Sequence, residues 1–144
     1  MKHTILILDD NDRRLNAMRA VTAAYPDCEA VLTYDAPHTI AWLKDHLSSA
    51  ALISLDHDLG PHKKVDGRIF DPGTGMDVVD YLTAQDSSCP VIVHTSSWSA
   101  RDRMVFALEA SGWDASFVIP YGDLDWINET WQAEVENFLA RFAG

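Results

Sequence analysis

Apolar residues occur along the chain in short continuous runs, separated by segments in which they recur every three to four positions. A continuous apolar run that is too short for a helix is typical of a strand buried on both faces. These runs predict strands at about 4–8, 30–33, 51–55, 90–94 and 116–119. The helical spacing predicts helices at about 12–24, 37–47, 76–84 and 100–111. A last helix has one apolar stripe, formed by Ile127, Trp131, Val135, Phe138 and Phe142.

Strands and helices alternate along the whole chain, and this alternation indicates the fold class. Parallel neighbouring strands need helical crossovers of one hand, so the pattern predicts an α/β doubly wound three-layer sandwich with a five-stranded parallel sheet. Of the two common strand orders, the flavodoxin-like order 2-1-3-4-5 fits the strand count. A chain of 144 residues with 47% hydrophobic residues suits one domain over residues 1–144.

Carboxylates end two of the predicted strands. Asp9 and Asp10 follow the first strand, and Asp56 follows the third. The predicted order makes these strands neighbours, and ligands of open parallel sheets bind at the carboxyl ends of the strands. Two like charges 4 Å apart repel by about 4 kcal/mol at an effective dielectric of 20, so the cluster needs protons, basic partners or a cation.

The ligand atoms of this cluster are all oxygen, which favours Mg²⁺, Mn²⁺ or Ca²⁺ over zinc. We expect Mg²⁺ (or Mn²⁺) to bind at Asp9, Asp10 and Asp56. The alternative is that Asp9 or Asp10 only caps the following helix, while Asp56 and Asp58 begin a turn.

Net charge limits the partners of the chain. The sequence has 22 acidic and 11 basic residues and a formal charge of -11, which argues against bulk nucleic-acid binding and leaves room for a locally basic phosphate pocket. No apolar run is long enough to span a membrane, and the N-terminal segment turns acidic too soon for a signal peptide. We therefore expect a soluble, cytoplasmic protein without a membrane partner.

Further candidates for chemistry lie beside the carboxylates. His57 and His94 titrate near neutrality when unperturbed and are candidate catalytic acids or bases. Asp58 is a candidate base for water or a further metal ligand. Each has an alternative, because His57 and Asp58 also suit a turn and His94 also suits a hydrogen-bonded core position.

Basic side chains provide candidate phosphate contacts. The segment 60–75, GPHKKVDGRIFDPGTG, is too long and too rich in Gly and Pro for a routine connection. We expect it to lie over the Asp56 edge and to bind phosphate through Lys63, Lys64 or Arg68. Arg101 is a further candidate, because guanidinium binds phosphate in a bidentate manner. The alternative for all of them is solvated surface charge.

With these motifs the sequence resembles the response-regulator receiver domain over essentially its whole length. Asp9 and Asp10 in LILDDND resemble the acidic pair of that family, Asp56 in ISLDHD its phospho-accepting aspartate, and Thr95 in VIVHTSS its hydroxyl residue. The segment GMDVVDYL resembles the start of its third helix. The resemblance implies that Asp10 and Asp56 ligate Mg²⁺ directly, that Asp9 acts indirectly, and that Thr95, with Ser96 beside it, contacts phosphate.

Two positions depart from the receiver pattern. FVIPYG places Ile119 before Pro120, where a receiver has a lysine that pairs with the acyl phosphate. Its aromatic switch position falls on Ser116 or Phe117. The segments LDHDLG, LDD with Arg13 close behind, and HTSSWSARDRM resemble a divergent receiver branch that is predicted to process cyclic phosphates.

Three functions follow from these observations. The first is a metal-dependent phosphoesterase acting on cyclic phosphates of nucleotides or RNA ends, with Asp56, His57, Asp58, His94 and Thr95 as the catalytic candidates. The second is a two-component receiver phosphorylated on Asp56 by a histidine kinase. The third is a catalytically inactive pseudo-receiver that serves as a binding module.

Overall fold

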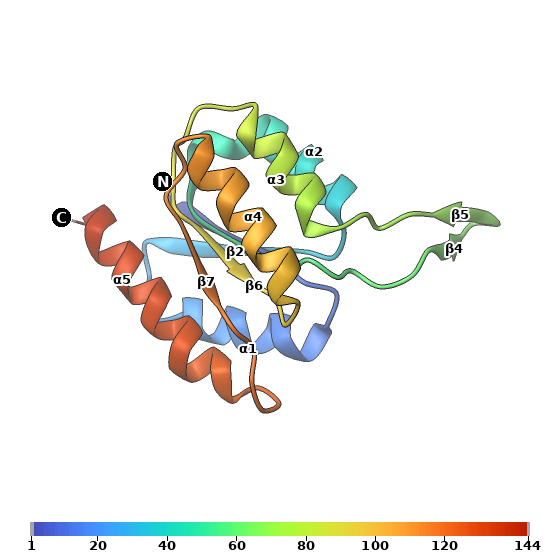
Figure 1. Ribbon diagram of the computed structural model, residues 1–144. Coiled ribbons are helices and arrows are strands. Elements are labelled where there is room, and N and C mark those ends of the chain that lie inside the picture. The colour runs from blue at the N-terminus through green and yellow to red at the C-terminus, as the bar shows by residue number, and fades with distance from the viewer. Residues whose placement is uncertain (1, 144) are drawn as a thin grey trace.

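The computed structural model describes the backbone of residues 2–143 and the side chains of residues 2–141. A parallel sheet forms the middle layer of the molecule (Figure 1). Its strands are β1 (His3–Leu8), β2 (Cys28–Thr33), β3 (Ala50–Leu55), β6 (Val91–His94) and β7 (Ala115–Val118). Their order is β2-β1-β3-β6-β7, which confirms the predicted order of the sheet strands taken in sequence.

Helices cover both faces of this sheet. On one face lie α2 (Ala36–His46), α3 (Gly75–Thr83) and α4 (Trp98–Ala110), and on the other lie α1 (Asp12–Thr22) and α5 (Gln132–Ala143) (Figure 1). A short 3₁₀ turn (Leu47–Ser49) follows α2, and a π-helical segment (Ile127–Trp131) leads into α5. None of the helices in the described part of the chain is long and apolar enough to cross a membrane.

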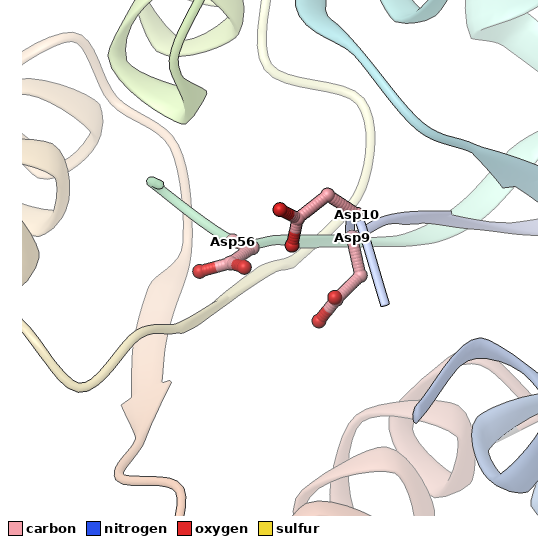
Figure 2. A group of neighbouring side chains, drawn as sticks. All are labelled: Asp9, Asp10 and Asp56. Carbon is pink, nitrogen blue, oxygen red and sulfur yellow. The ribbon is translucent and has the colours of Figure 1, made fainter. Parts of the chain in front are cut away.

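The register of β1, β2 and β3 brings the acidic residues together. Leu8 lies opposite Thr33 on one side and Leu55 on the other. The first residue beyond each strand continues the ladder, because Asp9 N–H donates to Thr33 O and Asp56 N–H donates to Leu8 O. Asp9 and Asp56 therefore extend from neighbouring strands at the same sheet edge (Figure 2).

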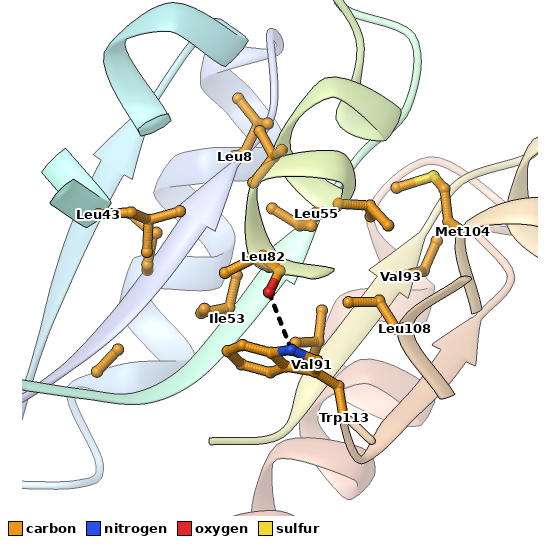
Figure 3. Close-up of a cluster of buried hydrophobic side chains, with 14 of the residues drawn as sticks. Leu8, Leu43, Ile53, Leu55, Leu82, Val91, Val93, Met104, Leu108 and Trp113 are labelled. Atoms are coloured by element: carbon orange, nitrogen blue, oxygen red, sulfur yellow. Dashed lines mark hydrogen bonds between the residues drawn. The ribbon is translucent and has the colours of Figure 1, made fainter. Parts of the chain in front are cut away.

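Alternating side chains of the buried strands supply two separate cores. On β1, Leu6 and Leu8 face the α2, α3 and α4 layer, while Ile5 and Ile7 face α1 and α5. In the first core, Trp113 Nε1 donates to Leu82 O at 3.1 Å (Figure 3). Burial on both faces explains why the strands read as continuous apolar runs.

The last helix follows the predicted stripe with one addition. Ile127, Trp131, Val135 and Phe138 are buried, as the spacing predicted, and Trp126 is buried with them. The side chain of Phe142 lies outside the described residues.

The segment 60–75, which we expected to lie over the Asp56 edge and in which no strand was predicted, projects from the molecule in its middle part (Figure 1). It contains a short antiparallel hairpin, β4 (Lys63–Val65) and β5 (Arg68–Phe70). Asp66 and Gly67 form its turn with φ of 52° and 77°, the left-handed conformation of a tight hairpin turn. The hairpin extends away from the body of the molecule (Figure 1). The Asp-Gly pair was the available signal, and the surrounding Gly and Pro residues obscured it.

Candidate metal and phosphate site

Three carboxylates meet at the carboxyl edge of the sheet (Figure 2). Asp9, Asp10 and Asp56 each offer an oxygen, and these oxygens lie within 4.8 Å of one another. Asp9 and Asp56 are buried, whereas Asp10 is partly exposed. The meeting of the two strand ends that the sequence predicted is thus present in the structure.

Arg14 lies among these carboxylates, and the sequence analysis did not identify it. Its Nη2 is 3.0 Å from Asp9 Oδ1, 3.5 Å from Asp56 Oδ2 and 3.7 Å from Asp10 Oδ1. Its Nε is buried without a hydrogen-bond partner among the described residues. The available signal was the spacing of four residues between Asp10, just before the Asn11 cap, and Arg14 in the first turn of α1. Arg13, noted in the sequence, instead pairs with Asp123 at the surface.

Asp9 is held at both of its oxygens. Oδ1 accepts hydrogen bonds from Arg14 and from the Asn11 backbone N–H. Oδ2 lies 3.1 Å from His94 Nε2, and both of these side chains are fully buried. Asp9 is therefore fixed in one orientation beside the more accessible Asp10.

A buried hydrogen-bond chain continues from His94 into the core. His94 Nδ1 lies 2.7 Å from Ser54 Oγ, and Trp131 Nε1 donates to the same Ser54 Oγ at 3.0 Å. Indole N–H can only donate, so Ser54 accepts from Trp131 and its own hydroxyl proton is free for His94 Nδ1. The ionised Asp9 carboxylate can only accept, so His94 Nε2 carries a proton that points at Asp9. The sequence left His94 as either a catalytic or a core residue, and its contacts favour the core alternative.

The three carboxyl groups respond differently to this environment. Burial tends to raise the pKa of Asp9, but the hydrogen bond and charge of His94, followed by the charge of Arg14, outweigh it, so the pKa is lowered. Burial and the charge of Asp9 raise the pKa of Asp10, against the charges of Arg14 and Lys63. Burial raises the pKa of Asp56 to about 6. Asp9 is therefore ionised at neutral pH, whereas Asp56 gains or loses its proton near pH 6.

A pocket of about 300 Å³ opens over the carboxylates. Thr95 and Ser96, both predicted phosphate contacts, line it together with Ser97, which caps α4. The remaining lining residues are Asp10, Arg14, Asp56, Asp58 and Gly60. The site thus combines carboxylates, a guanidinium and hydroxyl groups at the start of a helix, where phosphate groups commonly bind.

The sequence of this chain matches a known family over most of its length. The profile of the cyclic-phosphate processing receiver domain matches residues 4–110. The chain belongs to this receiver-domain family. A search of curated proteins found no match.

Solved structures of response regulators share the fold of this receiver domain. The phosphorylated cyanobacterial phytochrome response regulator RcpA is 17% identical over 98% of this chain and 96% of its own, with a TM-score of 0.74. The Mn²⁺-bound response regulator Rcp1 is 21% identical over 95% and 94%, with a TM-score of 0.67. The response regulator domain of Thermotoga maritima CheB is 15% identical over 98% and 96%, with a TM-score of 0.68.

Of the other predicted site residues, some line the pocket and some do not. Asp58 is exposed and lines the pocket, whereas His57 does not line it and contacts Asp56 through its backbone N–H. Burial and the charge of Arg103 lower the pKa of His57, which favours its neutral form. Ile119, the residue in place of the family lysine, is half exposed and lies outside the pocket lining.

The predicted basic contacts are not among the residues that line the pocket. Arg101 stacks over the Phe117 ring at 4.3 Å and donates to Asp102. Lys64 and Arg68 lie on the exposed hairpin. The cation that forms ion pairs with all three carboxylates is instead Arg14 of α1.

Proposed function

We propose that this receiver domain is a divalent-metal-dependent phosphoesterase that opens cyclic phosphates of nucleotides or RNA ends. The observation that carries the proposal is one pocket in which Asp10, Asp56 and Arg14 face the hydroxyl-bearing Thr95, Ser96 and Ser97. The family to which the chain belongs supports the choice of cyclic phosphates as substrates.

The carboxylate arrangement fits Mg²⁺ or Mn²⁺. Both oxygens of Asp9 already have partners, which suits an indirect role. Asp56 Oδ1 accepts from the His57 N–H, while Asp56 Oδ2 and Asp10 Oδ1 lie 3.5 and 3.7 Å from Arg14 Nη2. Asp10 and Asp56 would therefore hold the ion directly, through hard oxygen ligands that suit it. The structural neighbour Rcp1, with Mn²⁺ bound, agrees with a divalent ion in this fold.

Several side chains of the pocket would then contact the phosphate, each in a different role. The bound ion would supply positive charge and lower the pKa of a nearby water. Thr95 and Ser96 donate hydrogen bonds to phosphoryl oxygens at the start of α4. Arg14 lines the same pocket, and its guanidinium would bind a phosphoryl oxygen through charge-assisted hydrogen bonds while it keeps its contact with Asp9.

In the proposed reaction a water oxygen forms a bond to phosphorus, and one of the two ring P–O ester bonds breaks. Asp58 lines the pocket and accepts the proton of the water. The released sugar oxygen takes a proton from solvent at the open side of the pocket. The product is a phosphate monoester with a free hydroxyl.

Phosphorus NMR of the purified protein with a 2′,3′-cyclic mononucleotide and Mg²⁺ tests the proposal. We expect a monoester signal to appear with wild-type protein and to be absent with Asp10→Asn, Asp56→Asn or chelator. Asp80→Asn on the exposed side of α3 is the matched control for loss of one carboxylate. Metal binding without turnover in the wild type would instead support an inactive binding module.

Phosphorylation of Asp56 is the second candidate. It is favoured by the position of Asp56 beside Thr95 in the pocket and by the phosphorylated state of the structural neighbour RcpA. Against it stands Ile119, which supplies no cation for an acyl phosphate. The cyclic-phosphate reaction therefore remains the first choice.

A further inference from the structure

The β4–β5 hairpin is an exposed ribbon. All residues from 61 to 69 are exposed, including Val65 at 51% and Ile69 at 75%. A two-stranded hairpin with no third strand or helix against it is only marginally stable in water. Its projecting position (Figure 1) and its uncovered apolar side chains indicate a surface that contacts another molecule.

Contacts at its base fix the direction of the hairpin. The Phe70 ring lies 6.1 Å from the His38 ring, and His62 lies 3.4 Å from Asp71 across the two arms. The Ala36 N–H donates to Pro72 O at 2.8 Å. The hairpin also begins close to the pocket in the chain, because Gly60 belongs to the pocket lining.

The hairpin has an unusual charge for this chain. Its strands contain Lys63, Lys64 and Arg68, and its turn and base contain Asp66 and Asp71, so three basic residues face two acidic ones in a chain with a formal charge of -11. The pairs Lys63–Phe70 and Val65–Arg68 share one face of the ribbon, since opposite residues point the same way and alternate residues repeat. That face places two cations among two apolar side chains. Cations beside an aromatic ring such as Phe70 suit a single strand of nucleic acid, because phosphates pair with the cations and bases stack on the ring.

We propose that the hairpin docks the oligonucleotide strand whose cyclic phosphate end lies in the pocket. The inference rests on the proposed function. Of the two substrate classes proposed there, nucleotides and RNA ends, it selects RNA ends. Because the ribbon extends away from the carboxylates, a mononucleotide held at Asp56 does not reach its outer residues. A longer strand does, and its phosphates complement the hairpin in a chain that is acidic elsewhere.

The experiment compares wild-type protein with a Lys63→Ala, Arg68→Ala variant, which removes both cations of that face. The charge of Lys63 also acts on Asp10, and the rate with the mononucleotide measures that effect separately. The substrates are a ten-nucleotide RNA with a 2′,3′-cyclic phosphate end and the matching cyclic mononucleotide. We expect the ratio of kcat/KM for RNA to that for mononucleotide to fall by about tenfold, equal to about 1.4 kcal/mol. The slope of log affinity against log salt should shrink by about 1.4, at 0.7 per phosphate contact on a single strand.

A control variant removes the same charge elsewhere. Arg19→Ala, Lys44→Ala changes two exposed cations in the last turns of α1 and α2. An unchanged ratio of kcat/KM values in the hairpin variant, or an equal fall of this ratio in the control, would overturn the inference. The hairpin would then be a candidate surface for a protein partner. RNA binding by filter retention, with Asp56→Asn protein, keeps this test separate from catalysis. Failure of wild-type protein to open either substrate would overturn the proposed function, while the binding result would still decide the role of the hairpin.

Discussion

Asp56 is an anion in an unfavourable place, with 5% of its surface exposed and two other carboxylates beside it. Its pKa is raised from 3.8 to about 6. Between these values the native state holds a proton that the unfolded state has lost. The free energy of unfolding of the metal-free protein therefore falls as pH rises from about 4 to about 6, and the penalty is complete above that range.

We expect Asp56→Asn to stabilise the metal-free protein at pH 7 by about 1–3 kcal/mol, given 1.36 kcal/mol per pKa unit. Urea denaturation in chelator at pH 4.5 and pH 7.5 measures it, and the gain should shrink at the lower pH. The same variant should lose the rise in melting temperature that Mg²⁺ gives wild-type protein. A variant less stable than wild type at both values of pH would contradict the assignment of a buried, repelled charge.

Ser54 tests the buried hydrogen-bond chain behind Asp9. Ser54→Ala leaves Trp131 Nε1 and His94 Nδ1 without their partner, and we expect a loss of about 1–3 kcal/mol of stability. It should also weaken Mg²⁺ binding by about tenfold or more, because residues that orient a metal ligand commonly have such effects. Calorimetric titration measures the affinity.

Ser116→Ala is the matched control for this change, since its buried hydroxyl has no partner among the described residues. It should leave both stability and Mg²⁺ affinity nearly unchanged. Equal Mg²⁺ affinity in Ser54→Ala and wild-type protein would show that the chain from Trp131 to Asp9 serves packing alone.

At the scale of elements, the start of α3 lies directly against the Asp56 backbone. Gly75 N–H donates to His57 O, and a Cβ on Gly75 would lie only 2.0 Å from Asp56 O. Gly75→Ala must therefore shift α3 or the strand end. We expect it to cost about 1–3 kcal/mol, as overpacking does, and to weaken Mg²⁺ binding.

Denaturation and metal titration of Gly75→Ala measure both effects. Gly112→Ala is a useful control, because it has a positive φ of 89° but nothing within 4 Å of its added Cβ. It should lose stability through backbone strain and still bind Mg²⁺ normally. If Gly75→Ala also binds Mg²⁺ normally, the contact with Asp56 does not control the site.

The arrangement of elements was predictable from sequence where burial alone sets the pattern. Five apolar runs and the helical spacing between them were enough to predict the order of the strands. The residues that follow two of these strands were enough to predict that Asp9, Asp10 and Asp56 meet. Arg14 was not identified, because the direction of a long side chain from α1 depends on what the folded sheet edge presents to it. The same limit applies to the hairpin, whose position relative to the pocket no local pattern determines.

The π-helical segment before α5 shows a second limit. Trp126 and Trp131 are five residues apart, a spacing that an ordinary helix turns toward different faces. The wider turn of a π-helix brings both indoles to the sheet, and both are buried. The sequence pattern contained Trp131 in the expected stripe, but the stripe assumed regular helical spacing and so omitted Trp126.

Two features of the whole molecule disfavour a lasting phosphoryl group from small phosphodonors: its net negative charge and the absence of the family lysine. The formal charge of -11 repels small anionic donors, and Ile119 offers no cation to hold an acyl phosphate. We expect acetyl phosphate with Mg²⁺ to leave no long-lived adduct on Asp56. Intact-protein mass spectrometry measures this, with Asp56→Asn as the control.

A stable adduct of one phosphate on wild-type protein, absent from Asp56→Asn, would make the signalling function the better one. Arg14 would then be the cation that holds the acyl phosphate. In that case Arg14→Ala should shorten the lifetime of the adduct, while Arg101→Ala, whose guanidinium stacks on Phe117, should not.

The buried hydrogen bonds that connect Asp9 with the core lead to tryptophan side chains. The Trp126 ring stacks on the His94 imidazole at 5.8 Å between centroids, and the Trp131 indole is hydrogen-bonded to Ser54. We therefore expect an ion that binds at the carboxylates to change the polarity around two buried indoles. Ultraviolet emission from unlabelled protein should then follow a metal titration directly.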